Sequence, residues 1–249
     1  MNDNNGTQVE RQHSDRRRFL RSLGFTAVMG SVGGSLMPRA ASAANTMTKA
    51  QRDKLTPDEI IALMKRGNER FLKGGASTHN YIAQQRETAN DQHPAAIILS
   101  CIDSRAPVEI IMDLGIGDVF NSRVAGNISN EDILGSMEFA CKAAGAKLVL
   151  VMGHTSCGAV KGAIDGVRLG NLTGLLAKIR LAVDATDFKG DRSSKNLAFV
   201  DAVAAKNVEM TIDSVRAKSA VLCDLESAKA IKIVGAIYKL ETGKVDFLA

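Results

Sequence analysis

The chain has 249 residues, of which 45% are hydrophobic and 24% are charged, the profile of a globular protein with one sizeable core. Its formal net charge is +5, but residues 1–43 hold six arginines against three acidic residues, so the rest carries only +2. This weak charge, with no tryptophan and only two tyrosines, argues against a nucleic-acid-binding protein.

The first 43 residues have the pattern of an export signal. The pair Arg16-Arg17 precedes an apolar, Gly-rich run over residues 23–37, and small residues at 41–43 match a cleavage site. This order resembles the bacterial twin-arginine signal, and the run is shorter than the ~20 apolar residues of a membrane span. We therefore expect the twin-arginine translocase to export the protein. Removal of the signal would leave residues 44–249 as one periplasmic domain that does not enter the membrane.

Residues 56–73 predict the first helix of that domain. Thr56 can cap the helix, Pro57 suits its first turn, and Glu59 completes a capping box. Further on, helical patterns alternate with apolar runs of strand length at residues 95–101, 118–125, 147–154 and 231–240, with "KVDFL" close behind. This alternation predicts an α/β fold, with a central, mostly parallel β-sheet of four to five buried strands flanked by helices.

Polar groups follow the first and third of these strands. "AIILSCIDSR" ends in Cys101, Asp103 and Arg105, which share one face if the chain stays extended. The third strand runs into His154 and Cys157, spaced as H-x-x-C. In such sheets the carboxyl ends of the strands form the site, so these groups can meet there. Two thiolates and an imidazole suit tetrahedral Zn²⁺, with Asp103 or a water as the fourth ligand.

Each half of this pattern has a plainer explanation on its own. The first half also fits a core cysteine beside an ion pair, or half of a disulfide, and H-x-x-C arises by chance. Their coincidence at two strand ends favours the metal site. Export would favour disulfides, but twin-arginine substrates are exported folded, often with a cofactor loaded. We expect Cys141 and Cys223 to be buried small hydrophobic residues, and His79 and His93 to be structural or solvated.

The segments "SCIDSRAP" and "GHTSCGAVKG" together resemble the paired motifs of the β-class carbonic anhydrases. The resemblance runs from the first predicted helix to the final "TGKVDFL". It implies one Zn²⁺ per subunit, bound by Cys101, His154 and Cys157, and a catalytic dyad of Asp103 and Arg105. It also implies a homo-oligomer, dimer or tetramer, in which the N-terminal helix packs on a neighbouring subunit.

The same resemblance implies a substrate pocket for CO₂ and bicarbonate, formed by Gln92, Phe120, Ala125, Phe139 and Gly158. Arg123, in "SRVAGN", matches a further family position. Two positions depart from the family pattern, since Ala125 stands where Val is usual and Phe139 where Tyr is usual. The second change removes any hydrogen bond of the Tyr hydroxyl. Ile98 replaces a Trp of bicarbonate-regulated members, so we expect that regulatory site to be absent.

The implied reaction is the reversible hydration of CO₂ to bicarbonate and a proton by zinc-bound hydroxide. Zinc with three histidines lowers the pKa of its water to about 7. Two thiolates neutralise the dication, so we expect a higher pKa here and activity that rises with alkaline pH. Asp103 either ligates zinc and blocks the water, or pairs with Arg105 and orients the hydroxide.

Three alternative functions fit the sequence to different degrees. The same constellation could hydrolyse carbonyl sulfide or carbon disulfide, because substrate access rather than the ligand set decides between these substrates. A non-catalytic zinc protein is a second alternative, but it predicts loss of Asp103 or Arg105, and both are present. A thiol oxidoreductase would need a C-x-x-C motif, which the sequence lacks.

Overall fold

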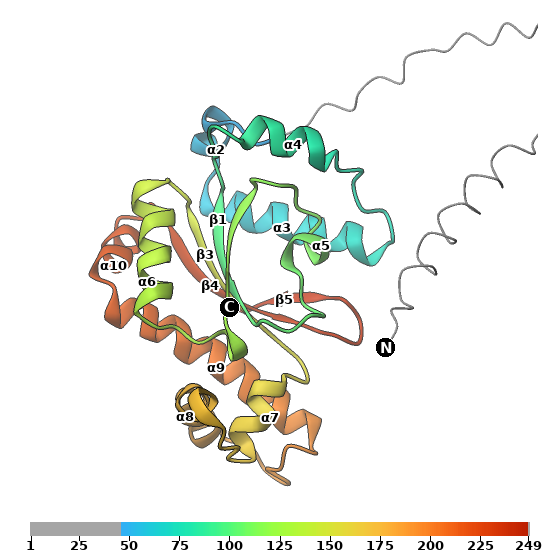
Figure 1. Ribbon diagram of the computed structural model, residues 1–249, viewed down its shortest axis with the longest axis vertical. Coiled ribbons are helices and arrows are strands. Elements are labelled where there is room, and N and C mark those ends of the chain that lie inside the picture. The colour runs from blue at the N-terminus through green and yellow to red at the C-terminus, as the bar shows by residue number, and fades with distance from the viewer. Residues whose placement is uncertain (1–45, 249) are drawn as a thin grey trace, which may run out of the picture. The chain divides into compact units, whose positions relative to one another are not determined.

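The computed structural model describes residues 46–248, which are built around one sheet (Figure 1). Four strands run parallel and the last is antiparallel to its neighbour, in the spatial order β2-β1-β3-β4-β5. The predicted α/β fold is therefore confirmed, while the predicted signal, residues 1–43, lies outside the described residues. The strands are β1 (Ala96–Ser100), β2 (Val119–Arg123), β3 (Leu148–His154), β4 (Lys232–Tyr238) and β5 (Val245–Phe247).

Helices connect the strands, and the first long one begins as its sequence predicts. The Thr56 hydroxyl accepts a hydrogen bond from Glu59 N, and the Glu59 carboxylate accepts one from Thr56 N, so the capping box is complete. The helices are α2 (Lys49–Lys54), α3 (Pro57–Leu72), α4 (Tyr81–Thr88), α5 (Val108–Ile111), α6 (Glu131–Glu138), α7 (Gly158–Ile164), α8 (Gly170–Ala185), α9 (Leu197–Lys218) and α10 (Ala220–Ser227), with a 3₁₀ turn η1 (Ala125–Asn127) and a π-helical turn η2 (Phe139–Ala143).

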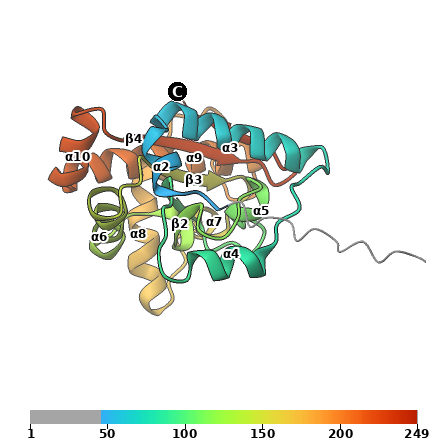
Figure 2. The same cartoon turned by 90° about the horizontal axis from the view of Figure 1, so that it is seen from above.

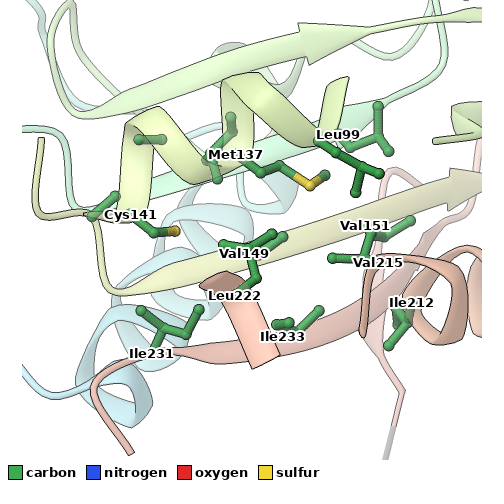
Figure 3. Close-up of a cluster of buried hydrophobic side chains, with 14 of the residues drawn as sticks. Leu99, Met137, Cys141, Val149, Val151, Ile212, Val215, Leu222, Ile231 and Ile233 are labelled. Carbon is green, nitrogen blue, oxygen red and sulfur yellow. The ribbon is translucent and has the colours of Figure 1, made fainter. Parts of the chain in front are cut away.

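Two apolar layers cover the two faces of the sheet, because successive strand residues point to opposite sides. Helices α3 and α5 pack on the face that includes Ile98 and Leu150. Helices α6, α9 and α10 pack on the other face. Of these, α6 and α10 lie on the opposite side of the molecule from α5 (Figures 1 and 2). Figure 3 shows this second layer, in which Met137 and Leu222 meet Leu99 and Val149 of the strands.

The two ends of the sheet are occupied differently. Helices α7 and α8 gather at the end to which β1 and β3 run, whereas α2 lies where β1 begins (Figure 1). Ser100 pairs with Met152, so the residues that follow β1 and β3 emerge side by side. Among the described helices, none is long and apolar enough to cross a bilayer.

Two expectations of burial are wrong. Strand β2 lies at the edge of the sheet, and Asn121 and Arg123 are exposed, because only β1 pairs with it. Its apolar sequence does not reveal this position, which depends on the order of the strands. Cys223 is exposed, unlike Cys141, because α10 buries the preceding Leu222 and turns the next residue toward solvent.

Asp113 lies just beyond the short helix α5 that follows β1. Helix α5 ends at Ile111, and Asp113 takes a left-handed φ of 49°. The buried Asp113 carboxylate accepts hydrogen bonds from Ser77 N at 2.9 Å and lies 3.0 Å from His79 Nε2. His79 is therefore a structural residue that helps to fix the loop between α3 and α4.

Candidate metal centre

Three side chains converge where β1 and β3 end. Cys101 follows β1, His154 closes β3, and Cys157 precedes the first residue of α7. Their ligand atoms all lie within 4.8 Å of one another, and each residue is at most 4% exposed. The two sulfur atoms are 4.0 Å apart, about twice the length of a disulfide bond. The arrangement is a three-ligand cluster of the kind that sequence spacing predicts.

The imidazole of His154 is oriented as a metal ligand requires. Its Nδ1 lies 2.9 Å from the carbonyl oxygen of Thr155, so Nδ1 carries the proton and donates it. Nε2 is buried and has no hydrogen-bond partner among the described residues. A buried nitrogen without a partner is costly, and a cation between Nε2 and the two sulfurs would satisfy it. The donor set therefore fits Zn²⁺.

The electrostatics of the two thiols favour the charged form at Cys101. A hydrogen bond from the Cys157 thiol, helped by the N–H of Gly126, lowers the pKa of Cys101 to about 4, against the effect of burial. The same contact raises the pKa of Cys157, since that thiol donates its proton to the neighbouring thiolate. Ionisation of Cys101 is therefore favoured over ionisation of Cys157, and a bound dication would stabilise the second thiolate.

Gly126 supplies a backbone donor that the sequence analysis did not single out. Its N–H donates to Cys101 Sγ at 3.3 Å from the η1 turn. Its φ is 69°, and an added Cβ would lie 2.4 Å from Ile179 Cδ1, so only glycine fits. In the sequence, the indication of this role was the glycine in "SRVAGN", a residue type that allows a positive φ.

Asp103 lies beside the cluster and is bound by Arg105. The Arg105 side chain donates from Nε at 2.9 Å and from a terminal nitrogen at 2.8 Å to the two carboxylate oxygens. These bonds hold the pKa of Asp103 well below its usual range. Asp103 Oδ2 is 3.8 Å from His154 Nε2, so the carboxylate faces the cluster. Of the two arrangements left open above, the structure has the Asp103–Arg105 pair.

Arg123 fixes the backbone of this segment. From strand β2 its Nε donates to the carbonyl oxygen of Cys101 at 2.8 Å, and a terminal nitrogen donates to that of Asp103 at 2.6 Å. The arginine that the resemblance carried over without a role thus shapes the turn that presents the thiol and the carboxylate.

The residues expected in the substrate pocket fall into two groups. Ala125 starts the η1 turn beside Gly126, and Gly158 follows a ligand. Phe120 and Phe139 instead pack against each other, with ring centroids 6.1 Å apart, next to a hollow at the outer edge of the sheet. Gln92 precedes β1, at the other end of the sheet from Cys101, and lines a hollow with Phe139. One chain therefore does not bring the second group to the cluster.

Comparison with known proteins places this arrangement in a family. Residues 96–245 match the family model described as carbonic anhydrase. Carbonic anhydrase 2 of Mycobacterium tuberculosis is 34% identical over 183 residues, 73% of this chain and 87% of that protein. The carbonic anhydrase of Mycolicibacterium smegmatis is 32% identical over 185 residues, 74% of this chain and 89% of that protein.

Solved structures agree with the sequence comparison. The crystal structure of the β-carbonic anhydrase CafA of Aspergillus fumigatus superimposes with a TM-score of 0.60 at 26% identity, over 77% of this chain and 91% of that one. The Coccomyxa β-carbonic anhydrase in complex with acetazolamide gives a TM-score of 0.59 at 25% identity, over 77% of this chain and 85% of that one. With its Cys-His-Cys cluster and its mostly parallel sheet, the chain belongs to the β-class carbonic anhydrases.

Proposed function

We propose that the protein hydrates CO₂ reversibly to bicarbonate and a proton at a Zn²⁺ held by Cys101, His154 and Cys157. One observation carries the proposal, namely the buried His154 Nε2 that lacks a partner among the described residues and faces two cysteine sulfurs. Two thiolates and one imidazole form a ligand set typical of zinc, and three protein ligands leave a fourth position for catalysis.

The surrounding residues have roles that follow from their contacts. When bound, zinc supplies a water acidic enough to act as a nucleophile near neutral pH. The ionised Asp103 can only accept hydrogen bonds, so it takes one from the attacking water and turns a lone pair toward CO₂. Arg105 holds both oxygens of Asp103 and keeps that carboxylate from becoming a fourth ligand.

We also propose that the active form is a homo-oligomer, a dimer or a tetramer. Phe139 is 58% exposed, and with Phe120 it flanks an edge strand that pairs on one side only. An unpaired edge with exposed aromatic rings is unfavourable in water and suits contact with a second copy. In such an oligomer, the cluster of one subunit would be lined by Gln92, Phe120 and Phe139 of its neighbour. This arrangement would give these residues a place in the substrate pocket although they lie away from the cluster of their own chain.

Export to the periplasm is a further part of the proposal, and it rests on the twin-arginine pattern in residues 1–43. Cell fractionation of the bacterial host, with wild type and with Arg16→Lys/Arg17→Lys, tests it. Protein in the periplasmic fraction that is lost in the double variant supports export through the twin-arginine translocase. Periplasmic protein in both variants would contradict this route.

The catalytic proposal is tested by zinc analysis and by stopped-flow assays of the purified protein. We expect about one zinc per subunit and hydration of CO₂ that is lost when zinc is removed and restored when it is added back. Carbonyl sulfide and carbon disulfide are assayed side by side under the same conditions. A higher kcat/KM on either sulfur substrate than on CO₂ would replace the proposed substrate while leaving the metal site intact.

A further inference from the structure

Thr155 and Ser156, the two residues between His154 and Cys157, each donate a hydrogen bond to a carboxylate from a distant part of the chain. Ser156 N donates to Asp201 Oδ1 at 2.8 Å, and Asp201 lies near the start of α9. Thr155 Oγ1 donates to Glu241 Oε2 at 3.1 Å, and Glu241 follows β4 in the turn toward β5. Neither carboxylate contacts a metal ligand through a hydrogen bond, and the roles described above use neither of them.

Ser156 has a backbone conformation that needs support. Its φ is 54°, in the left-handed region that side chains other than glycine rarely adopt. This reversal lets the chain turn from β3 into α7, so that a strand residue and a helix cap point at the same site. The bond to Asp201 satisfies the Ser156 N–H in this strained conformation.

Thr155 is the second fixed point of the loop. Its N–H donates to the carbonyl of Tyr238 at 3.0 Å, and its hydroxyl accepts from Leu240 N at 2.9 Å while donating to Glu241. Its carbonyl oxygen is the acceptor for His154 Nδ1. A shift of Thr155 would therefore disturb the hydrogen bond that orients the imidazole.

Asp201 is partly buried, in a setting that disfavours its negative charge. Burial raises the pKa of Asp201, and repulsion from Glu241 acts in the same direction, while the Ser156 N–H and Lys161 oppose them. The hydrogen bond from the Ser156 N–H therefore offsets an unfavourable setting for a charged Asp201.

We propose that Asp201 and Glu241 are positioning residues that hold the His154–Cys157 loop in its metal-binding shape. The proposal rests on the proposed zinc site, because it concerns the geometry with which that site binds the ion. Outer partners of metal ligands typically change metal affinity by about 10–100-fold when removed. We expect Asp201→Ala to weaken zinc binding by an amount in that range.

The test measures zinc affinity by competition with a chelator, and the rate of zinc release, on the purified full-length protein. Asp201→Asn keeps an oxygen acceptor for the Ser156 N–H and should stay close to wild type. Asp201→Ala/Ser156→Gly should recover part of the lost affinity, because glycine adopts a positive φ without strain. The matched control is Asp213→Ala, which removes an aspartate of the same helix whose side chain is 78% exposed.

The outcomes separate this inference from the proposed function. If wild type binds no zinc, the proposed function fails and this inference fails with it. If wild type binds zinc and Asp201→Ala binds it equally tightly, only the inference is overturned. Should Asp201→Ala fail to fold, as judged by circular dichroism, Thr155→Val and Glu241→Ala replace it. Wild-type zinc affinity in both of these variants would overturn the inference as well.

Discussion

The loop after β1 and the loop after β3 supply the same site but are held in different ways. After β1, Asp103 is bound by Arg105 only two residues away, and the Arg105 side chain is 56% exposed. After β3, Thr155 and Ser156 are bound by carboxylates 86 and 45 residues further along the chain. The loop after β1 is thus held by a local pair and is the more exposed of the two, whereas the more buried loop after β3 is held by residues that the fold brings in from elsewhere.

Removal of a ligand from the buried loop should have the largest effect. Cys157→Ser replaces a thiolate with a hydroxyl that does not ionise near neutral pH, so we expect zinc content below about a tenth of wild type. CO₂ hydration should fall with it. The measurement is zinc per subunit by atomic emission, with the exposed Cys223→Ser as control. Full zinc occupancy in Cys157→Ser would show that this loop is not the anchor of the metal.

A change in the exposed loop should instead separate metal binding from turnover. Asp103→Asn keeps the shape but loses the charge that orients the attacking water, so kcat should fall by about 10²-fold or more. Zinc content should stay at the wild-type level, because Asp103 is paired with Arg105 and not with the cluster. Stopped-flow hydration with matched zinc analysis checks this, and near-normal turnover would refute the role of Asp103.

Arg123 connects the exposed loop to the edge strand, and its loss should have an intermediate effect. Arg123→Met keeps most of the side-chain volume but removes both hydrogen bonds to the backbone of Cys101 and Asp103. We expect kcat to fall by about tenfold with zinc retained, since the loop loosens around its ligand. Arg86→Met, an exposed arginine of α4, is the matched control. Loss of zinc together with turnover would mean that the two loops are not independently held.

The smallest effect concerns stability against pH. Arg105 holds the folded pKa of Asp103 below the value of about 3.9 in an unfolded chain. The pair therefore stabilises the fold fully above that value and loses its contribution as the pH falls through the folded pKa. The difference in unfolding free energy between metal-free wild type and Asp103→Asn should be constant from about pH 7 to 5 and shrink below about pH 4. A difference that already shrinks near pH 6 would contradict the pairing.

Much of the exposed loop and of the sheet could be predicted from local sequence. Thr56 and Glu59 form the expected capping box, and the three ligands meet because parallel strands end at one edge. Asp103 and Arg105 pair as their i, i+2 spacing allows. In each case the partners are either close in sequence or placed by a general property of parallel sheets.

The remaining features depend on which elements become neighbours in space, and periodicity does not carry that information. The edge position of β2 follows from the strand order, which the apolar runs alone leave undetermined. Asp201 and Glu241 reach the second loop from α9 and the β4–β5 turn, and no local motif marks either residue. The placement of Gln92 and Phe139 away from the cluster likewise became visible only with the fold.

Zinc-dependent catalysis is tested most directly by CO₂ hydration measured as a function of zinc occupancy. Metal-free protein is loaded with zinc in steps from zero to one equivalent per subunit, and the initial rate is recorded at each step. We expect a rate that rises in proportion to bound zinc and reaches its maximum at one equivalent. Hydration at full rate without zinc, or none at full occupancy, would contradict it.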